Sequence, residues 1–149
     1  MIVVDTSVFI DALFEYDKKR TELAKNLFRL IQELKIPVAE PDIFKVELIG
    51  QLVRRMPKDE AMSLYELLVG KIETVDTCGL REISFEIAFQ TGCRAIDSFY
   101  ISVAHSRRSA LVSNDKFQVE SAKNYGVNAF YLLEEFRELE EFLKDSTKG

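Results

Sequence analysis

Histidine and cysteine are scarce in this chain of 149 residues, which has one histidine and two cysteines. The single histidine, His105, cannot by itself supply a zinc site or a two-histidine acid/base mechanism. Cys78 and Cys93 lack CxxC spacing and are too few for a disulfide framework, so we expect buried thiols in a reducing compartment. These absences exclude zinc catalysis and a disulfide-stapled fold.

Long apolar runs and an excess of positive charge are also missing. No stretch approaches the roughly 20 apolar residues of a membrane span, and no basic segment precedes the first apolar run. The net charge of −5 argues against a broad basic surface that binds nucleic acid, so any phosphate binding must be local. We therefore expect a cytoplasmic protein without membrane contact.

Three common phosphate-binding and catalytic motifs do not occur. The chain has neither a GxxxxGK[ST] loop nor a GxGxxG loop, which excludes nucleotide binding through either phosphate-binding loop. It also has no GxSxG turn for a nucleophilic serine. Its chemistry must rest on other side chains.

Short apolar segments alternate with segments of helical periodicity along the chain. The length and the 47% hydrophobic content suit one domain spanning residues 1–149. Apolar runs without polar alternation indicate strands buried on both faces, and we predict them at 2–4, 35–39, 72–75, 110–112 and 127–131. We predict helices at 7–14, 21–34, 41–55, 58–69, on both sides of Gly92, at 115–125 and at 134–144. The expected class is α/β, a three-layer α/β/α sandwich with a central, mostly parallel sheet.

Four acidic residues occupy apolar settings: Asp5, Glu47, Asp97 and Asp115. A buried, unpaired carboxylate costs several kcal/mol or is neutralised by a pKa shift. Four such placements favour a shared cation site.

Asp5 and Asp115 each follow a predicted strand. Ligands of open parallel sheets bind beyond the carboxyl ends of the strands, so both side chains should face that crevice if their strands are neighbours. The alternative for each is simple helix capping, since aspartate is a favoured N-cap residue.

Asp97 and Glu47 lie on predicted helices. Asp97 falls within the apolar arc of its helix beside Ile101 and Ala104, and its alternative role is a capping carboxylate paired with Arg94. Glu47 belongs to a helix that is apolar nearly all round, and its alternative is a buried ion pair with an arginine.

The chemistry of this donor set indicates the metal. Oxygen ligands without histidine or thiolate select Mg²⁺ or Mn²⁺, which bind phosphate oxygens and activate water for phosphodiester hydrolysis. Neutral residues flank the acids and would orient them or hold a water, or would make ordinary turns: Thr6, Ser7, Ser113 and Asn114.

The chain resembles the PIN-domain family, and in particular the stand-alone VapC-type ribonuclease toxins. The resemblance runs from residue 2 to about 131 and rests on four motifs in order: residues 3–7, Glu47, residues 94–104 and residues 111–117. It implies a Rossmann-like sandwich that cleaves RNA with Mg²⁺ or Mn²⁺ held by Asp5, Glu47, Asp97 and Asp115. It also implies a homodimer and, for toxin members, a small antitoxin whose tail enters the acidic groove.

The fourth motif departs from the family pattern. Many members carry another acid there, whereas this chain has Phe117 and Gln118, which leaves open whether one metal or two bind. Arg94, Arg54 and Lys116 are candidates for substrate binding because they lie near the motifs in the sequence.

Other functions remain open at this point. A haloacid-dehalogenase-like phosphatase would need a second aspartate where Ser7 stands. A catalytically silent PIN-like module would bind RNA or a protein, although it has no need to keep four repelling carboxylates together. An RNA-processing nuclease outside any toxin system is the third alternative.

Overall fold

The first strand, β1 (Ile2–Val4), belongs to a three-stranded sheet of order β1-β4-β5, and none of its three side chains is exposed. In the computed structural model, which describes residues 1–148, β1 pairs in parallel with β4 (Ala110–Ser113), aligning Val4 with Val112. β4 pairs in parallel with β5 (Ala129–Tyr131). Apolar runs buried on both faces are typical of such parallel strands.

A second, smaller sheet lies beside the first. It consists of β2 (Ala39–Pro41) and β3 (Glu73–Val75), again parallel. A single bridge between Ile2 and Val38 connects it to β1. The sheet is therefore split between β1 and β2, next to the end of β1.

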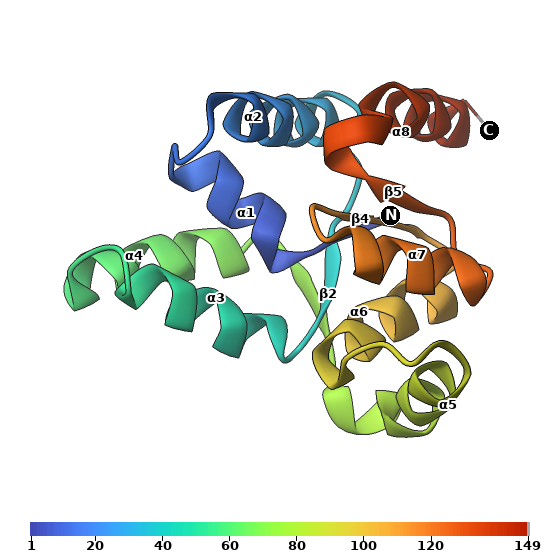
Figure 1. The fold of residues 1–149 in the computed structure, drawn as a ribbon. Helices are drawn as coiled ribbons and strands as arrows, with labels where there is room; N and C mark the ends of the chain where they lie inside the picture. The colour runs from blue at the N-terminus through green and yellow to red at the C-terminus, as the bar shows by residue number, and fades with distance from the viewer. Residues whose placement is uncertain (149) are drawn as a thin grey trace.

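Helices cover both faces of the strands. Figure 1 shows α2 and α8 together on one side of the sheet and α5 and α6 on the other. This arrangement confirms the predicted α/β class with helices around a central parallel sheet. The helix bounds are α1 Thr6–Leu13, α2 Lys18–Glu33, α3 Phe44–Val53, α4 Lys58–Val69, the 3₁₀ turn η1 Thr77–Leu80, α5 Arg81–Thr91, α6 Ala95–Ser106, α7 Lys116–Asn124 and α8 Leu132–Thr147.

The second strand is displaced from its predicted position. The sequence predicts a strand at 35–39, but Lys35 has a φ of 54° and belongs to the turn that follows α2, so that β2 begins only at Ala39. Pro41 was expected in the first turn of the next helix and instead ends β2, because α3 starts at Phe44. A proline can close a strand because it needs no further ladder hydrogen bond there.

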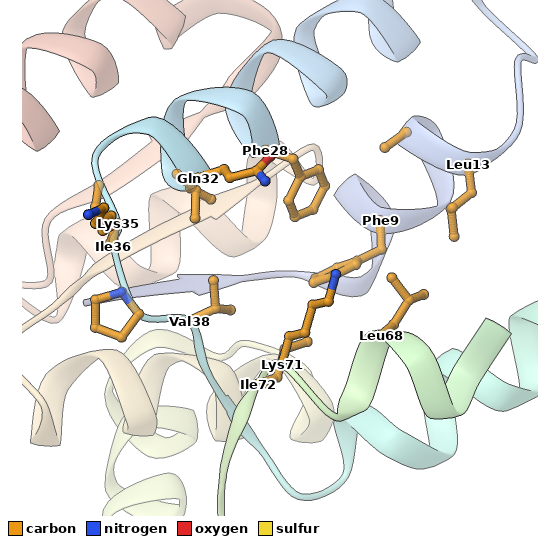
Figure 2. A pocket seen from close by; sticks show the side chains of 13 residues that line it. Phe9, Leu13, Phe28, Gln32, Lys35, Ile36, Val38, Leu68, Lys71 and Ile72 are labelled. Carbon is orange, nitrogen blue, oxygen red and sulfur yellow. The ribbon is translucent and has the colours of Figure 1, made fainter. Parts of the chain in front are cut away.

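An apolar hollow of about 480 Å³ lies between α1, α2, the residues before β2 and the end of α4. Figure 2 shows Phe9, Phe28, Val38 and Leu68 around it, with Lys71 beside them. No acidic residue lines this hollow, so it is distinct from the acidic cavity described below. Among residues 1–148, every helix falls short of the length and apolar character that a bilayer crossing demands.

Candidate active site

Four carboxylates from different parts of the chain line one cavity of about 380 Å³. The cavity lies at the carboxyl ends of β1 and β4, where parallel sheets bind their ligands. The structure thus brings together all four acids singled out in the sequence. The lining residues are Asp5, Glu47, Arg94, Ala95, Ile96, Asp97 and Asp115.

Asp5 and Asp115 reach the cavity because their strands are neighbours, and the amide of Asp5 donates to the carbonyl of Val112 at 3.0 Å. Both also cap helices. Oδ2 of Asp5 accepts from the amide of Ser7 at 3.0 Å, and Oδ1 of Asp115 accepts from the amide of Phe117 at 3.0 Å. Capping therefore occurs, but it uses one oxygen of each carboxylate and leaves the other for different partners.

Arg94 ties Asp97 and Asp115 together. Its Nε donates to Oδ2 of Asp97 at 3.0 Å, and its terminal nitrogen donates to Oδ2 of Asp115. The Asp97 side chain is 7% exposed and that of Arg94 is 66% exposed, so the cation reaches inward from the surface. The ion pair weighed as the alternative for Asp97 is thus formed, and it is part of the cavity.

Glu47 projects from the first turn of α3 and accepts two hydroxyl hydrogen bonds. Tyr100 donates to its Oε1 at 2.5 Å, and Thr6 donates to the same atom at 3.1 Å. Within residues 1–148 Glu47 forms no ion pair, so the arginine partner considered from the sequence does not exist. Its ionised form is stabilised by the Tyr100 and Thr6 hydroxyls and, through space, by the charge of Arg94.

Burial and mutual repulsion disfavour the ionised forms of two of these acids. Burial raises the pKa of Asp97, and the charges of Asp115 and Asp5 add to the increase, while Arg94 opposes it. Burial also raises the pKa of Glu47, where the charge of Asp5 adds to the increase and the Tyr100 hydroxyl opposes it. A site of this kind gains from a cation that neutralises several carboxylates at once.

The four neutral residues predicted around the acids have different partners. Thr6 contacts Glu47 as described, and the Ser113 hydroxyl accepts from the amide of Asp115 at 2.9 Å. The Ser7 hydroxyl accepts from the amide of Asn114 at 3.3 Å, which joins the ends of β1 and β4. The Asn114 side chain turns to Asp11 instead, at 2.6 Å.

Of the three basic candidates, only Arg94 lines the cavity. Arg54 is the exposed residue at the end of α3, and Lys116 is exposed at the start of α7. Arg54 and Lys116 are close to the motifs in the sequence but do not line the cavity.

Three polar residues near the cavity were not singled out in the sequence: Tyr100, Gln118 and Glu40. Tyr100 was counted among the apolar residues of its helix, although a buried tyrosine usually needs a hydrogen-bond partner. Gln118 is fully buried, and its Nε2 donates to Oδ1 of Asp5 at 3.3 Å. Glu40 lies in a strand predicted to end one residue earlier, so no sequence signal marked it.

The donor set suits a hard divalent cation, because every carboxylate of the cavity offers oxygen and no histidine or cysteine lines it. The buried Oε1 of Gln118, whose Nε2 contacts Asp5, has no hydrogen-bond partner within residues 1–148. In the arrangement of residues 1–148, however, no three acidic, histidine or cysteine side chains are close enough together to enclose an ion. The guanidinium of Arg94 bridges Asp97 and Asp115 instead.

The fold and the acid cavity together define an α/β domain with a central parallel sheet and four carboxylates at the carboxyl ends of its strands, and comparison with known families assigns it to one family. The model described as the PIN domain matches residues 2–124, so the chain belongs to the PIN-domain family. This confirms the family resemblance predicted from the sequence. No curated protein sequence matches the chain.

Several solved structures share this fold at low sequence identity. FitAcB from Neisseria gonorrhoeae is 20% identical, with a TM-score of 0.66 and coverage of 90% of this chain and 99% of that one. VapBC2 from Rickettsia felis, bound to a fragment of its promoter, is 18% identical, with a TM-score of 0.65 and coverage of 87% and 98%. PAE2754 from Pyrobaculum aerophilum is 17% identical, with a TM-score of 0.64 and coverage of 97% and 89%. At these identities the likeness concerns the fold.

Proposed function

We propose that this protein is an endoribonuclease that hydrolyses RNA phosphodiester bonds with Mg²⁺ or Mn²⁺. The observation that carries the proposal is the convergence of Asp5, Glu47, Asp97 and Asp115 on one cavity of a PIN domain. Retaining four mutually repelling carboxylates is costly unless a cation uses them. A silent binding module would have no such need.

The four carboxylates are the groups that would hold the cation. The oxygens of Asp5, Asp97 and Asp115 would exchange hydrogen bonds to amide or guanidinium groups for the ion, and the Glu47 oxygen would keep its hydroxyl donors. When bound, a divalent cation supplies charge neutralisation at a phosphate oxygen and lowers the pKa of a bound water. The Tyr100 and Thr6 hydroxyls fix the orientation of Glu47, and Gln118 fixes Asp5.

Arg94 is the basic group placed to receive the substrate. Its guanidinium is largely exposed yet reaches the acids at the cavity, so it can transfer hydrogen bonds from Asp115 to a phosphate oxygen. A guanidinium matches two phosphate oxygens in a planar, bidentate geometry. Arg94 would thus bind the RNA backbone without reading its sequence.

The direct test is cleavage of a mixed-sequence single-stranded RNA with Mg²⁺, with Mn²⁺ and with a chelator. Wild type should cleave only with the metal, and Asp5→Asn and Asp97→Asn should abolish cleavage while keeping the fold. Asp59→Asn, on the exposed first turn of α4, is the matched control and should cleave like wild type. Metal-independent cleavage, or full activity in Asp5→Asn, would refute the proposal.

We further propose that the nuclease is the toxin of a toxin–antitoxin pair, acting with a small partner protein. Support comes from the fold shared with FitAcB and with VapBC2, the latter bound to a fragment of its promoter. An apolar segment of that partner would bind in the apolar hollow beside α1 and α2. Acidic residues of the partner on either side of this segment would face Lys35 and Lys71. A short adjacent reading frame whose product inhibits cleavage would support this role, and its absence would favour an RNA-processing nuclease.

Self-association is the third part of the proposal. Three apolar side chains on α3 and α4 are strongly exposed: Val46 at 69%, Leu67 at 61% and Met62 at 46%. Exposed apolar surface of this kind often marks an interface. The family resemblance implies a homodimer as well.

A further inference from the structure

The split between β1 and β2 leaves the amide of Val4 in β1 without a backbone acceptor in β2. At the start of the pair, the amide of Ile2 donates to the carbonyl of Pro37 at 3.0 Å. In a parallel pair, alternate amides of one strand face the same neighbour, so the amide of Val4 also faces β2. No backbone carbonyl of β2 receives it, because only the Ile2–Val38 bridge joins the two strands within residues 1–148.

The side chain of Glu40 takes the place of that missing carbonyl. Its Oε1 accepts from the amide of Val4 at 2.8 Å, and the residue is fully buried. Its Oε2 has no hydrogen-bond partner, and Glu40 forms no ion pair within residues 1–148. A buried carboxyl with a single backbone partner is costly, so its retention calls for a role.

We propose that Glu40 is a positioning residue of the acid cavity: its Oε1 holds the amide of Val4 where the sheet splits, and thereby places the Asp5 carboxylate that follows. The other side of this segment is fixed by the amide of Asp5, which donates to Val112 at 3.0 Å. Glu40 and Val112 thus accept hydrogen bonds from the amides of Val4 and Asp5 on opposite sides of β1. The inference rests on the proposed function, since it assigns Glu40 a part in the same site.

The chemistry of Glu40 distinguishes this role from that of a fifth metal ligand. Burial raises the pKa of Glu40 well above its ordinary value, and the charges of Asp5 and Glu47 add to the increase, while the Val4 amide opposes it. Glu40 does not line the cavity. Burial thus favours the protonated carboxyl, which accepts the Val4 hydrogen bond through its carbonyl oxygen and adds no negative charge behind the acids.

Two conservative variants distinguish the length of the Glu40 side chain from its acidity. Glu40→Gln keeps the length of the side chain and an oxygen acceptor, while Glu40→Asp keeps the carboxyl but withdraws it by one methylene. We expect Glu40→Gln to retain kcat and Mn²⁺ affinity within about threefold, because a neutral isostere does the same work. We expect Glu40→Asp to lose roughly tenfold or more in kcat with little change in KM, because misplacing a ligand slows the chemical step.

Amide hydrogen exchange at Val4 gives a readout that does not depend on activity. Protection should match wild type in Glu40→Gln and fall in Glu40→Asp, with both variants folded by circular dichroism. Unchanged protection or unchanged kcat in folded Glu40→Asp would overturn the inference, as would a loss of Mn²⁺ affinity in Glu40→Gln equal to that in Asp5→Asn. If wild type cleaves no RNA, the proposed function fails, and the exchange comparison still decides whether Glu40 holds Val4.

Discussion

The hydroxyl of Tyr100 donates a 2.5 Å hydrogen bond to the carboxylate of Glu47 and joins α6 to α3 across the acid cavity. Tyr100 is fully buried and also lies 2.6 Å from the Thr6 hydroxyl. One phenol therefore connects the helix that carries Asp97, the helix that carries Glu47 and the residue that follows Asp5. The geometry of the acids depends on a network that reaches beyond the carboxylates themselves.

Tyr100→Phe should destabilise the protein and slow cleavage. It removes the donor to a carboxylate, a hydrogen bond of a class that contributes about 1.5–3 kcal/mol. Denaturant unfolding and the rate of RNA cleavage measure the two effects. Tyr65→Phe is the control, because the Tyr65 hydroxyl has no hydrogen bond within residues 1–148. Equal stability in Tyr100→Phe and Tyr65→Phe would show that the network is not energetically important.

Arg94→Gln should lower the stability of the metal-free protein and increase the rise in melting temperature caused by Mn²⁺. Without the guanidinium, the largely buried Asp97 loses the only cationic partner that it has within residues 1–148, and a divalent ion would no longer compete with Arg94 for Asp97 and Asp115. The rise in melting temperature caused by Mn²⁺ should exceed that of wild type, although cleavage slows because a phosphate ligand is lost. Arg29→Gln, at an exposed position of α2, is the control. A smaller Mn²⁺ effect in Arg94→Gln than in wild type would contradict this view.

Part of the site could be read from the sequence because its signals are local. Asp5 and Asp115 stand directly after apolar strands, and Asp97 falls within the apolar arc of its helix, so each departs from the pattern around it. The sequence left open whether β1 and β4 are neighbours, and the structure shows that they pair. The four acids could nevertheless be predicted without knowledge of specific contacts.

The supporting residues depend on contacts between distant segments and left no local signal. Glu40 matters because β2 turns away from β1 toward β3, a path that the strand expected at 35–39 did not anticipate. Tyr100 is separated by 53 residues from Glu47, and Gln118 by 113 residues from Asp5. Such pairings are set by tertiary packing, which periodicity does not encode.

Glu47→Gln should stabilise the metal-free protein at neutral pH. Because burial raises the pKa of Glu47 in the folded state, its contribution to stability is fully present below the ordinary value of 4.5 and is lost as pH rises through the folded value. Glutamine keeps the acceptor for Tyr100 and Thr6 without the charge. The stability gain over wild type should therefore be present at pH 7 and disappear below pH 4.5, as measured by denaturant unfolding with a chelator. A gain that is independent of pH would rule out charge repulsion as its cause.

Leu67→Lys should reduce self-association. Leu67 is 61% exposed on α4, and a lysine there would place a charge within an apolar interface. Light scattering should give about twice the chain mass of 17.1 kDa for wild type and a value nearer the monomer for the variant. Asn26→Lys introduces the same charge at an exposed polar position on α2 and should leave the mass unchanged. A wild-type monomer at micromolar concentration would remove the dimer from the proposal.

Binding of Mn²⁺ or Mg²⁺ should raise the melting temperature of the protein. The folded cavity gathers four carboxylates that are dispersed in the unfolded chain, so the ion binds the folded state and stabilises it by about 2.7 kcal/mol at a hundredfold excess over its Kd. The gain should shrink as pH falls toward 5, because the raised pKa values of Asp97 and Glu47 let protons compete for the same oxygens. It should also be smaller in Asp5→Asn than in the Asp59→Asn control. If Mn²⁺ leaves the melting temperature of wild type unchanged, or shifts wild type and Asp5→Asn equally, the four acids do not act as one metal site.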